Sequence, residues 1–116
     1  MKSKLFIGII GGIIFSTNAL AVGEANSFKV VSVRADQSGF GYVRFDKPLE
    51  GSPASCISGG HDYHLSFDLN TPGGKGIMSI ALAAQATGKS VIARGTGTCA
   101  GYNVVERWNY GWVVTN

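Results

Sequence analysis

The aromatic residues near the C-terminus are the ones best suited to contact a ligand. Trp108, Tyr110 and Trp112 alternate with Asn109 and Gly111. Alternate side chains of an extended strand share one face, so the three rings are predicted to project together. Aromatic faces beside hydrogen-bonding groups suit sugar rings, whose C–H surfaces stack on them. The same pattern suits the interior of a small barrel or a subunit interface, and both interpretations stay open.

The ligand-binding interpretation leads to a defined set of contact residues. An earlier segment, 40–46, also alternates and contributes one aromatic and one basic side chain. The predicted ligand is a cell-surface glycan, with arginine and asparagine side chains as polar partners of the rings. The predicted contact residues are Tyr42, Arg44, Trp108, Asn109, Tyr110 and Trp112.

Two histidines form the metal-like cluster of the sequence. His61 and His64 flank Asp62 at close spacing, whereas zinc sites usually need three or four ligands. In an extended segment, residues three apart point to opposite faces, so only Asp62 and His64 would share one. We therefore expect a solvated loop that runs into a strand, with no metal and no cofactor. A loop conformation that brings the two histidines together is the alternative.

The glycine-rich motifs predict no catalytic or phosphate-binding site. Gly88-Lys89-Ser90 resembles the end of a P-loop, but Ala83 stands where that motif needs glycine, and the segment follows a predicted helix instead of preceding one. Gly95-Thr96-Gly97 is not followed by a helix, as a dinucleotide loop would be. No nucleophile is paired with a base. The sequence therefore indicates a protein that is not an enzyme.

The N-terminus has the three parts of a secretory signal peptide. Lys2 and Lys4 precede an apolar run over 5–15, and Ala19-Leu20-Ala21 ends the segment. The run is shorter than the roughly 20 residues that span a bilayer. We expect 1–21 to be a cleaved signal peptide and 22–116 to be a single exported domain, secreted or periplasmic, with no membrane span.

The charge of the mature chain argues against nucleic acid as a partner. The formal net charge is +3, and two of these charges belong to Lys2 and Lys4, so removal of the leader leaves +1. No run of lysine or arginine follows that could track a phosphate backbone.

The two cysteines predict one disulfide. Cys56 and Cys99 are the cysteines of the chain, and disulfides persist in exported proteins. A metal-binding or nucleophilic thiol is the alternative, but the spacing is not that of a CxxC motif. A bridge between Cys56 and Cys99 would close a long loop. In the chain-entropy description it would stabilise the folded state by about 4 kcal/mol.

Hydrophobic periodicity predicts an α+β domain that is mostly β. A helix is expected between the third and fourth strands, ended by Gly88. This order is typical of a small OB-like five-stranded barrel, with a curved open sheet covered by one helix as the alternative. The helix has no charged residue, which favours cover from a second copy in a homo-oligomer. The expected strands are 28–35, 40–46, 63–69, 90–94 and 102–114, the last being one long strand or a bent pair, and the expected helix is 76–87.

Three segments around the predicted helix carry a family resemblance: 78–84 (MSIALAA), 87–91 (TGKSV) and 95–99 (GTGTC). In these the chain resembles small exported proteobacterial proteins of unassigned function. More distantly, it is similar to the receptor-binding B subunits of subtilase-type cytotoxins. That resemblance implies an OB fold, pentamers and recognition of cell-surface glycans, and no contact residues are carried over from it. The alternative function is an envelope accessory or inhibitor domain that binds an exported protein partner.

Overall fold

The computed structural model describes residues 21–115, so the predicted leader, except for Ala21, lies outside the described residues. The strands form one six-stranded sheet in the order β4-β2-β1-β5-β6, with the short β3 paired to β1. Along the chain the elements are β1 (Gly23–Ala35), β2 (Phe40–Phe45), β3 (Glu50–Gly51), η1 (a 3-10 helix, His61–Tyr63), β4 (His64–Asp68), α2 (Pro72–Thr87), β5 (Ser90–Gly95) and β6 (Trp108–Val113).

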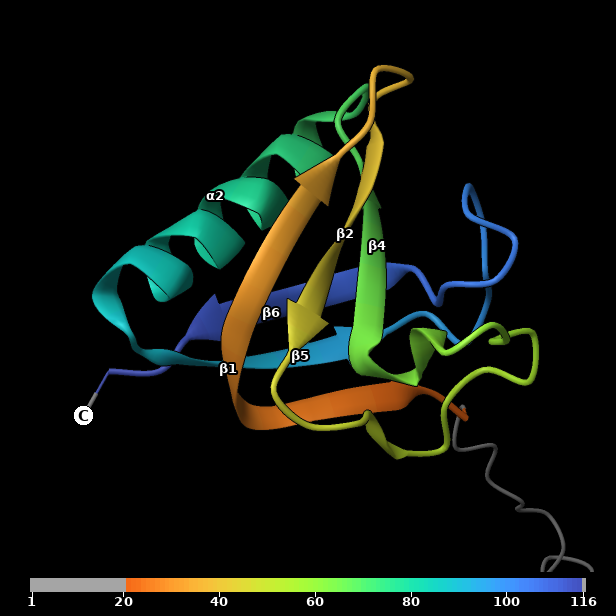
Figure 1. Ribbon diagram of the computed structural model, residues 1–116, viewed down its shortest axis with the longest axis horizontal. Coiled ribbons are helices and arrows are strands. Elements are labelled where there is room, and N and C mark those ends of the chain that lie inside the picture. Colours follow the sequence, from red (N-terminus) through yellow and green to blue (C-terminus); the bar gives the residue numbers. More distant parts are fainter. Residues whose placement is uncertain (1–20, 116) are drawn as a thin grey trace, which may run out of the picture.

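Strand β1 bends through the molecule and belongs to both halves of the sheet (Figure 1). Its first part pairs with β5 and its second part with β2, both antiparallel. The pairing shifts register at Ser27, which has a φ of 61°, and again at Val31. Extra residues of this kind bend a strand and increase its twist. The sheet therefore curls, and a parallel bridge between Ser66 and Arg107 links β4 to the segment before β6.

Helix α2 lies between β4 and β5 in the chain and packs against the sheet (Figure 1). Thr71 caps it, since its hydroxyl oxygen accepts a hydrogen bond from the Gly74 N–H at 3.0 Å, and Pro72 suits the first turn. Gly88, with a φ of 72°, ends it as predicted. The helix begins four residues before the predicted start at Gly76, because the Thr71 cap and Pro72 set its first turn.

The core lies on one face of the curled sheet, under α2. Ala81 and Ala84 are the buried apolar residues of the helix, and these small side chains let it lie close to the strands. The strands contribute the large side chains, namely Phe28, Val43, Phe45, Leu65, Phe67, Val91 and Trp108.

The predicted class is confirmed at the level of a mostly β domain with one helix and an antiparallel sheet. The predicted disulfide is confirmed as well: Cys56 and Cys99 are bridged at 2.02 Å and join the loop after β3 to the loop after β5. The predicted long last strand is wrong in length, because β6 begins at Trp108. Before it the chain turns and bonds to the preceding loop, with the Arg107 N–H donating to the Thr98 carbonyl at 2.8 Å.

Candidate functional site

Tyr110 and Trp112 form an exposed aromatic pair on β6. Their side chains are 54% and 49% exposed. The ring planes lie within 6° of each other, with centroids 6.4 Å apart. Large apolar rings held in this way in solvent are available to a ligand or partner.

Trp108 does not belong to this pair, so the prediction that three rings share one face is wrong for this residue. Tyr110 pairs with Arg94, but the next residue of β5, Gly95, pairs with Trp108. Asn109 is thus an extra residue, exposed at a β-bulge. The bulge turns Trp108 to the core face, where it is 2% exposed and packs against Phe45 with ring centroids 6.1 Å apart.

The exposed pair is the edge of a larger surface, which we call the outer face. Cross-strand pairing places Arg94 between Tyr110 and Glu24, and it places Ile92 between Trp112 and Asn26. The alternate residues of β1 and β5 are buried and face the core. The outer face is the side of β1, β3, β5 and β6 opposite the core and comprises Glu24, Asn26, Glu50, Ile92, Arg94, Tyr110 and Trp112.

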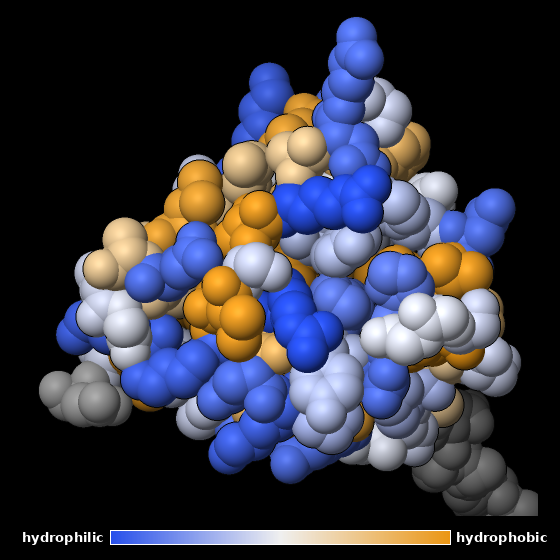
Figure 2. Space-filling view, in the orientation of Figure 1, coloured by the Kyte–Doolittle hydropathy of each residue, from blue (hydrophilic) through white to orange (hydrophobic). Residues whose placement is uncertain are grey.

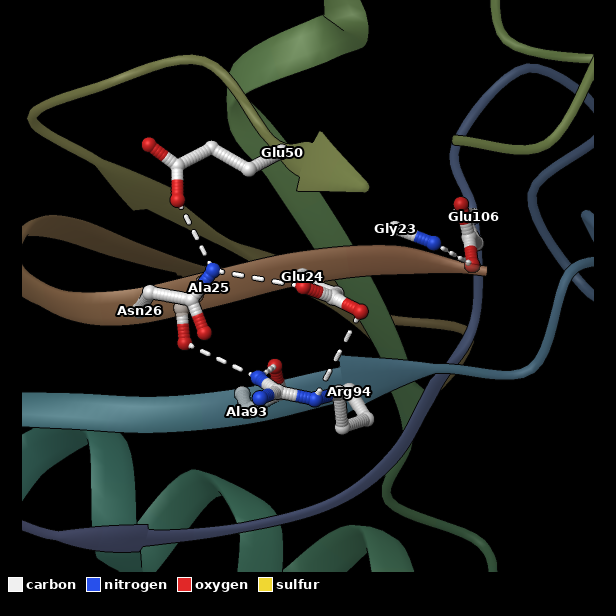
Figure 3. A network of polar contacts seen from close by, with 8 residues as sticks. All are labelled: Gly23, Glu24, Ala25, Asn26, Glu50, Ala93, Arg94 and Glu106. Carbon is white, nitrogen blue, oxygen red and sulfur yellow. Dashed lines mark hydrogen bonds and ion pairs between the residues drawn. The ribbon is translucent and has the colours of Figure 1, made fainter. Parts of the chain in front are cut away.

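A polar network fixes the side chains beside the rings (Figure 3). The Asn26 amide nitrogen donates to Glu50 Oε1 at 2.8 Å and to Glu24 Oε1 at 3.3 Å. Arg94 Nε lies 4.0 Å from Glu24 Oε2, and Arg94 Nη1 donates to the Ala93 carbonyl at 2.9 Å. The guanidinium donors of Arg94 thus stand next to the aromatic pair, and the carboxylate acceptors follow across the sheet, Glu24 on β1 and Glu50 on β3. The described residues enclose no pocket, so the outer face is an open surface.

Sequence reasoning missed the polar half of the outer face. Glu24 and Asn26 precede Phe28, where the first strand was expected to begin. Arg94 lay inside a predicted strand, but nothing in the sequence gave its neighbour across the sheet. The alternation of 23–26 was the available signal, and it needed the pairing with β5 to become informative.

Tyr42 and Arg44 lie on β2, which β1 and β5 separate from β6 in the sheet order. The structure therefore does not bring them together with Tyr110 and Trp112. The Tyr42 hydroxyl accepts a hydrogen bond from Arg34 Nη1 at 3.0 Å. The Arg44 guanidinium lies over the Tyr63 ring, 4.8 Å from its centroid.

Tyr42 instead belongs to a second aromatic group, which we call the histidine cluster and define as Tyr42, His61, His64 and Tyr102. The Tyr42 ring centroid lies 4.6 Å from that of His64 and 5.5 Å from that of Tyr102. The Tyr102 hydroxyl is buried with no hydrogen-bond partner within the described part of the chain. This cluster packs on the side of β2 and β4 opposite the core.

The two histidines meet, contrary to the expectation for an extended segment. Their Nδ1 atoms are 3.3 Å apart, because η1 replaces an extended backbone at residues 61–63. Burial, together with the neighbouring positive charges of His61 and Arg44, lowers the pKa of His64 to about 4. Among residues 21–115 no group of three or more His, Cys, Asp or Glu side chains is arranged to hold a metal ion.

In comparisons with known proteins, no family model, no curated protein and no solved structure matches the chain. The resemblance to toxin B subunits therefore stays a prediction from the sequence. In the part of the chain that the structure describes, no helix is both long and apolar enough to cross a bilayer.

Proposed function

We propose that the mature domain is an exported, non-enzymatic binding module whose outer face binds a glycan. The observation that carries this proposal is the parallel, half-exposed pair of Tyr110 and Trp112 beside a fixed set of hydrogen-bonding side chains. Sugar C–H surfaces stack on aromatic rings, while sugar hydroxyls bond to carboxylates, amides and guanidinium groups.

The dimensions of the outer face suit an oligosaccharide. From Tyr110 on β6 to Glu24 on β1 there are two strand spacings, or about 10 Å. A single pyranose ring on the aromatic pair would not reach the carboxylates at that separation. A chain of sugars that crosses the strands would stack one residue on Trp112 and Tyr110 and bring the next one to Arg94 and Glu24.

We further propose that the fold is an OB-like five-stranded barrel. The strand order β4-β2-β1-β5-β6, with the helix between β4 and β5, supports this assignment. The parallel bridge from Ser66 to Arg107 supports closure between the first and last strands of that order. An OB-like fold would agree with the resemblance to glycan-binding toxin subunits, and the disulfide agrees with a secreted or periplasmic location.

The test is the substitution Trp112→Ala, screened on a glycan array with the oxidised, leader-free domain. The wild-type protein should bind a defined set of oligosaccharides, and the variant should lose at least tenfold in affinity because the stacking surface is gone. Leu82→Ala is the matched control, since Leu82 is also a large apolar residue, 44% exposed, but lies on α2. Equal loss in both variants, or no glycan bound by the wild-type protein, would contradict the proposal.

A second candidate function is binding of a protein partner through α2 and β1. Apolar side chains gather on the surface over α2 (Figure 2). Leu82 and Val31 are large apolar residues exposed there, and the Gln85 amide, on the same helix, donates to the Val31 carbonyl at 3.0 Å. Light scattering of the domain tests which partner this surface binds. An oligomer that is lost in Leu82→Asp would make it a subunit contact, which is compatible with the glycan proposal, whereas a monomer would favour a different protein as its partner.

A further inference from the structure

A fully buried carboxylate lies at the start of β1. Glu106 accepts hydrogen bonds from three backbone N–H groups: Gly23 at 2.9 Å and Gly97 at 2.9 Å on Oε2, and Ala54 at 2.8 Å on Oε1 (Figure 3 shows the first). The ion pairs formed among residues 21–115 involve other carboxylates. Glu106 is thus solvated by amides, and no cationic side chain of the described residues pairs with it.

The space around this carboxylate is built to hold it. A Cβ at Gly95 would overlap Oε2, and a Cβ at Gly23 would lie 2.8 Å from Oε1. Glycine at both positions lets the backbone approach the charged group directly. An uncompensated carboxylate at such a depth is costly, so a nearby positive charge would stabilise the folded state.

The backbone of Val22 is held beside Glu106. The Val22 carbonyl accepts a hydrogen bond from the Ser52 N–H at 2.9 Å, and Gly97 faces the Ala21 carbonyl. Since the Gly23 nitrogen is 2.9 Å from Glu106 Oε2, covalent geometry places the Val22 nitrogen within about 6.5 Å of that oxygen. Cleavage before Val22 would convert this amide nitrogen into a charged ammonium group.

We propose that Glu106 is the acceptor for the α-ammonium group of Val22 in the processed protein, so that removal of the leader stabilises the domain. The inference rests on the predicted cleavage after Ala21 and is independent of the glycan proposal. The ammonium supplies the positive charge that the buried carboxylate lacks. Of the other carboxylates nearby, Glu24 is engaged by Arg94 and Asn26, and Glu50 by Asn26, on the outer face. The unprocessed chain has an uncharged amide at this position, so its folded domain is less stable.

The experiment compares two forms of the oxidised 22–116 chain, one with a free amine at Val22 and one with an acetylated amine. The acetyl group keeps a carbonyl where Ala21 has one and removes only the charge. The free form should melt about 4–8 °C higher near pH 6. This difference should begin to fall near pH 8, the ordinary pKa of an α-amine, and disappear at higher pH, because the contact with Glu106 raises the pKa of the amine in the folded protein.

The variant Glu106→Gln identifies the acceptor, since it should abolish the difference between the free and acetylated forms. If the variant does not fold, the pH dependence of the difference in melting temperature between the free and acetylated wild-type forms still tests whether a charged amine at Val22 stabilises the domain. Equal melting temperatures for the two wild-type forms, or a difference that does not change between pH 6 and pH 9, would overturn the proposal.

Discussion

The outer face and the histidine cluster are built from similar residue types, yet one is open and the other is covered. On the outer face, Tyr110 and Trp112 stand half in solvent beside a fixed polar network. In the histidine cluster, Tyr42 packs against Tyr102, from the segment before β6, and against the buried His64. An aromatic residue alternating with polar ones therefore does not by itself indicate a binding surface. What decides is whether another segment of the chain lies over it.

The largest expected effect separates the two tryptophans. Trp108→Ala should lower the free energy of unfolding by about 3–5 kcal/mol, because it removes a large buried ring. Trp112→Ala should change it by no more than about 0.5 kcal/mol, as is usual for exposed residues. Urea denaturation of both variants measures the difference. Similar losses in the two would mean that Trp112 is a core residue and that the outer face is not a free surface.

The second prediction concerns the histidine cluster and pH. Because the pKa of His64 is lowered to about 4 in the folded state, the unfolded chain binds a proton near its ordinary value of 6.5 while the folded chain does not. The contribution of His64 to the free energy of unfolding is then fully present above pH 6.5. It falls as the pH decreases toward 4 and levels off below pH 4. The loss has an upper limit of about 3 kcal/mol. Denaturation curves from pH 7 to 4 measure it.

The variant His64→Gln is the control for that titration. It should remove most of the fall in stability between pH 6.5 and 4, while the carboxylates continue to titrate at lower pH. A fall of unchanged size in the variant would show that His64 is not the responsible group. The outer face contains no histidine, so glycan binding should vary little over the upper part of this range.

The smallest expected effect tests whether the polar network contributes to glycan binding. Glu50→Gln keeps an acceptor for Asn26 but removes the charge, so glycan affinity should fall about two- to fivefold, as for the loss of one charge-assisted hydrogen bond. Asp62→Asn is the matched control, because Asp62 is an exposed carboxylate beside the histidine cluster. Isothermal titration with an array-selected oligosaccharide measures both. Unchanged affinity in the Glu50 variant would remove this carboxylate from the site.

The parts of the fold set by local chemistry could be predicted from the sequence. The alternation of Phe40–Phe45, the glycine that ends α2 and the single cysteine pair each led to a confirmed element. The site was only half predictable. Asn109 forms a bulge that turns Trp108 into the core, and an alternating pattern cannot reveal one inserted residue. The neighbours of Arg94 depend on the order of the strands in the sheet. That order is set by pairing between residues far apart in the sequence, which a local pattern does not reveal.

The most direct test of the central claim uses the two indole N–H signals of the protein. In an NMR titration with an array-selected oligosaccharide, the account predicts that the Trp112 indole signal and the Arg94 and Glu24 amides shift, while the Trp108 indole signal stays in place. Shifts confined to the histidine cluster, or to Leu82 and its neighbours on α2, would contradict the assignment of the outer face as the glycan-binding surface.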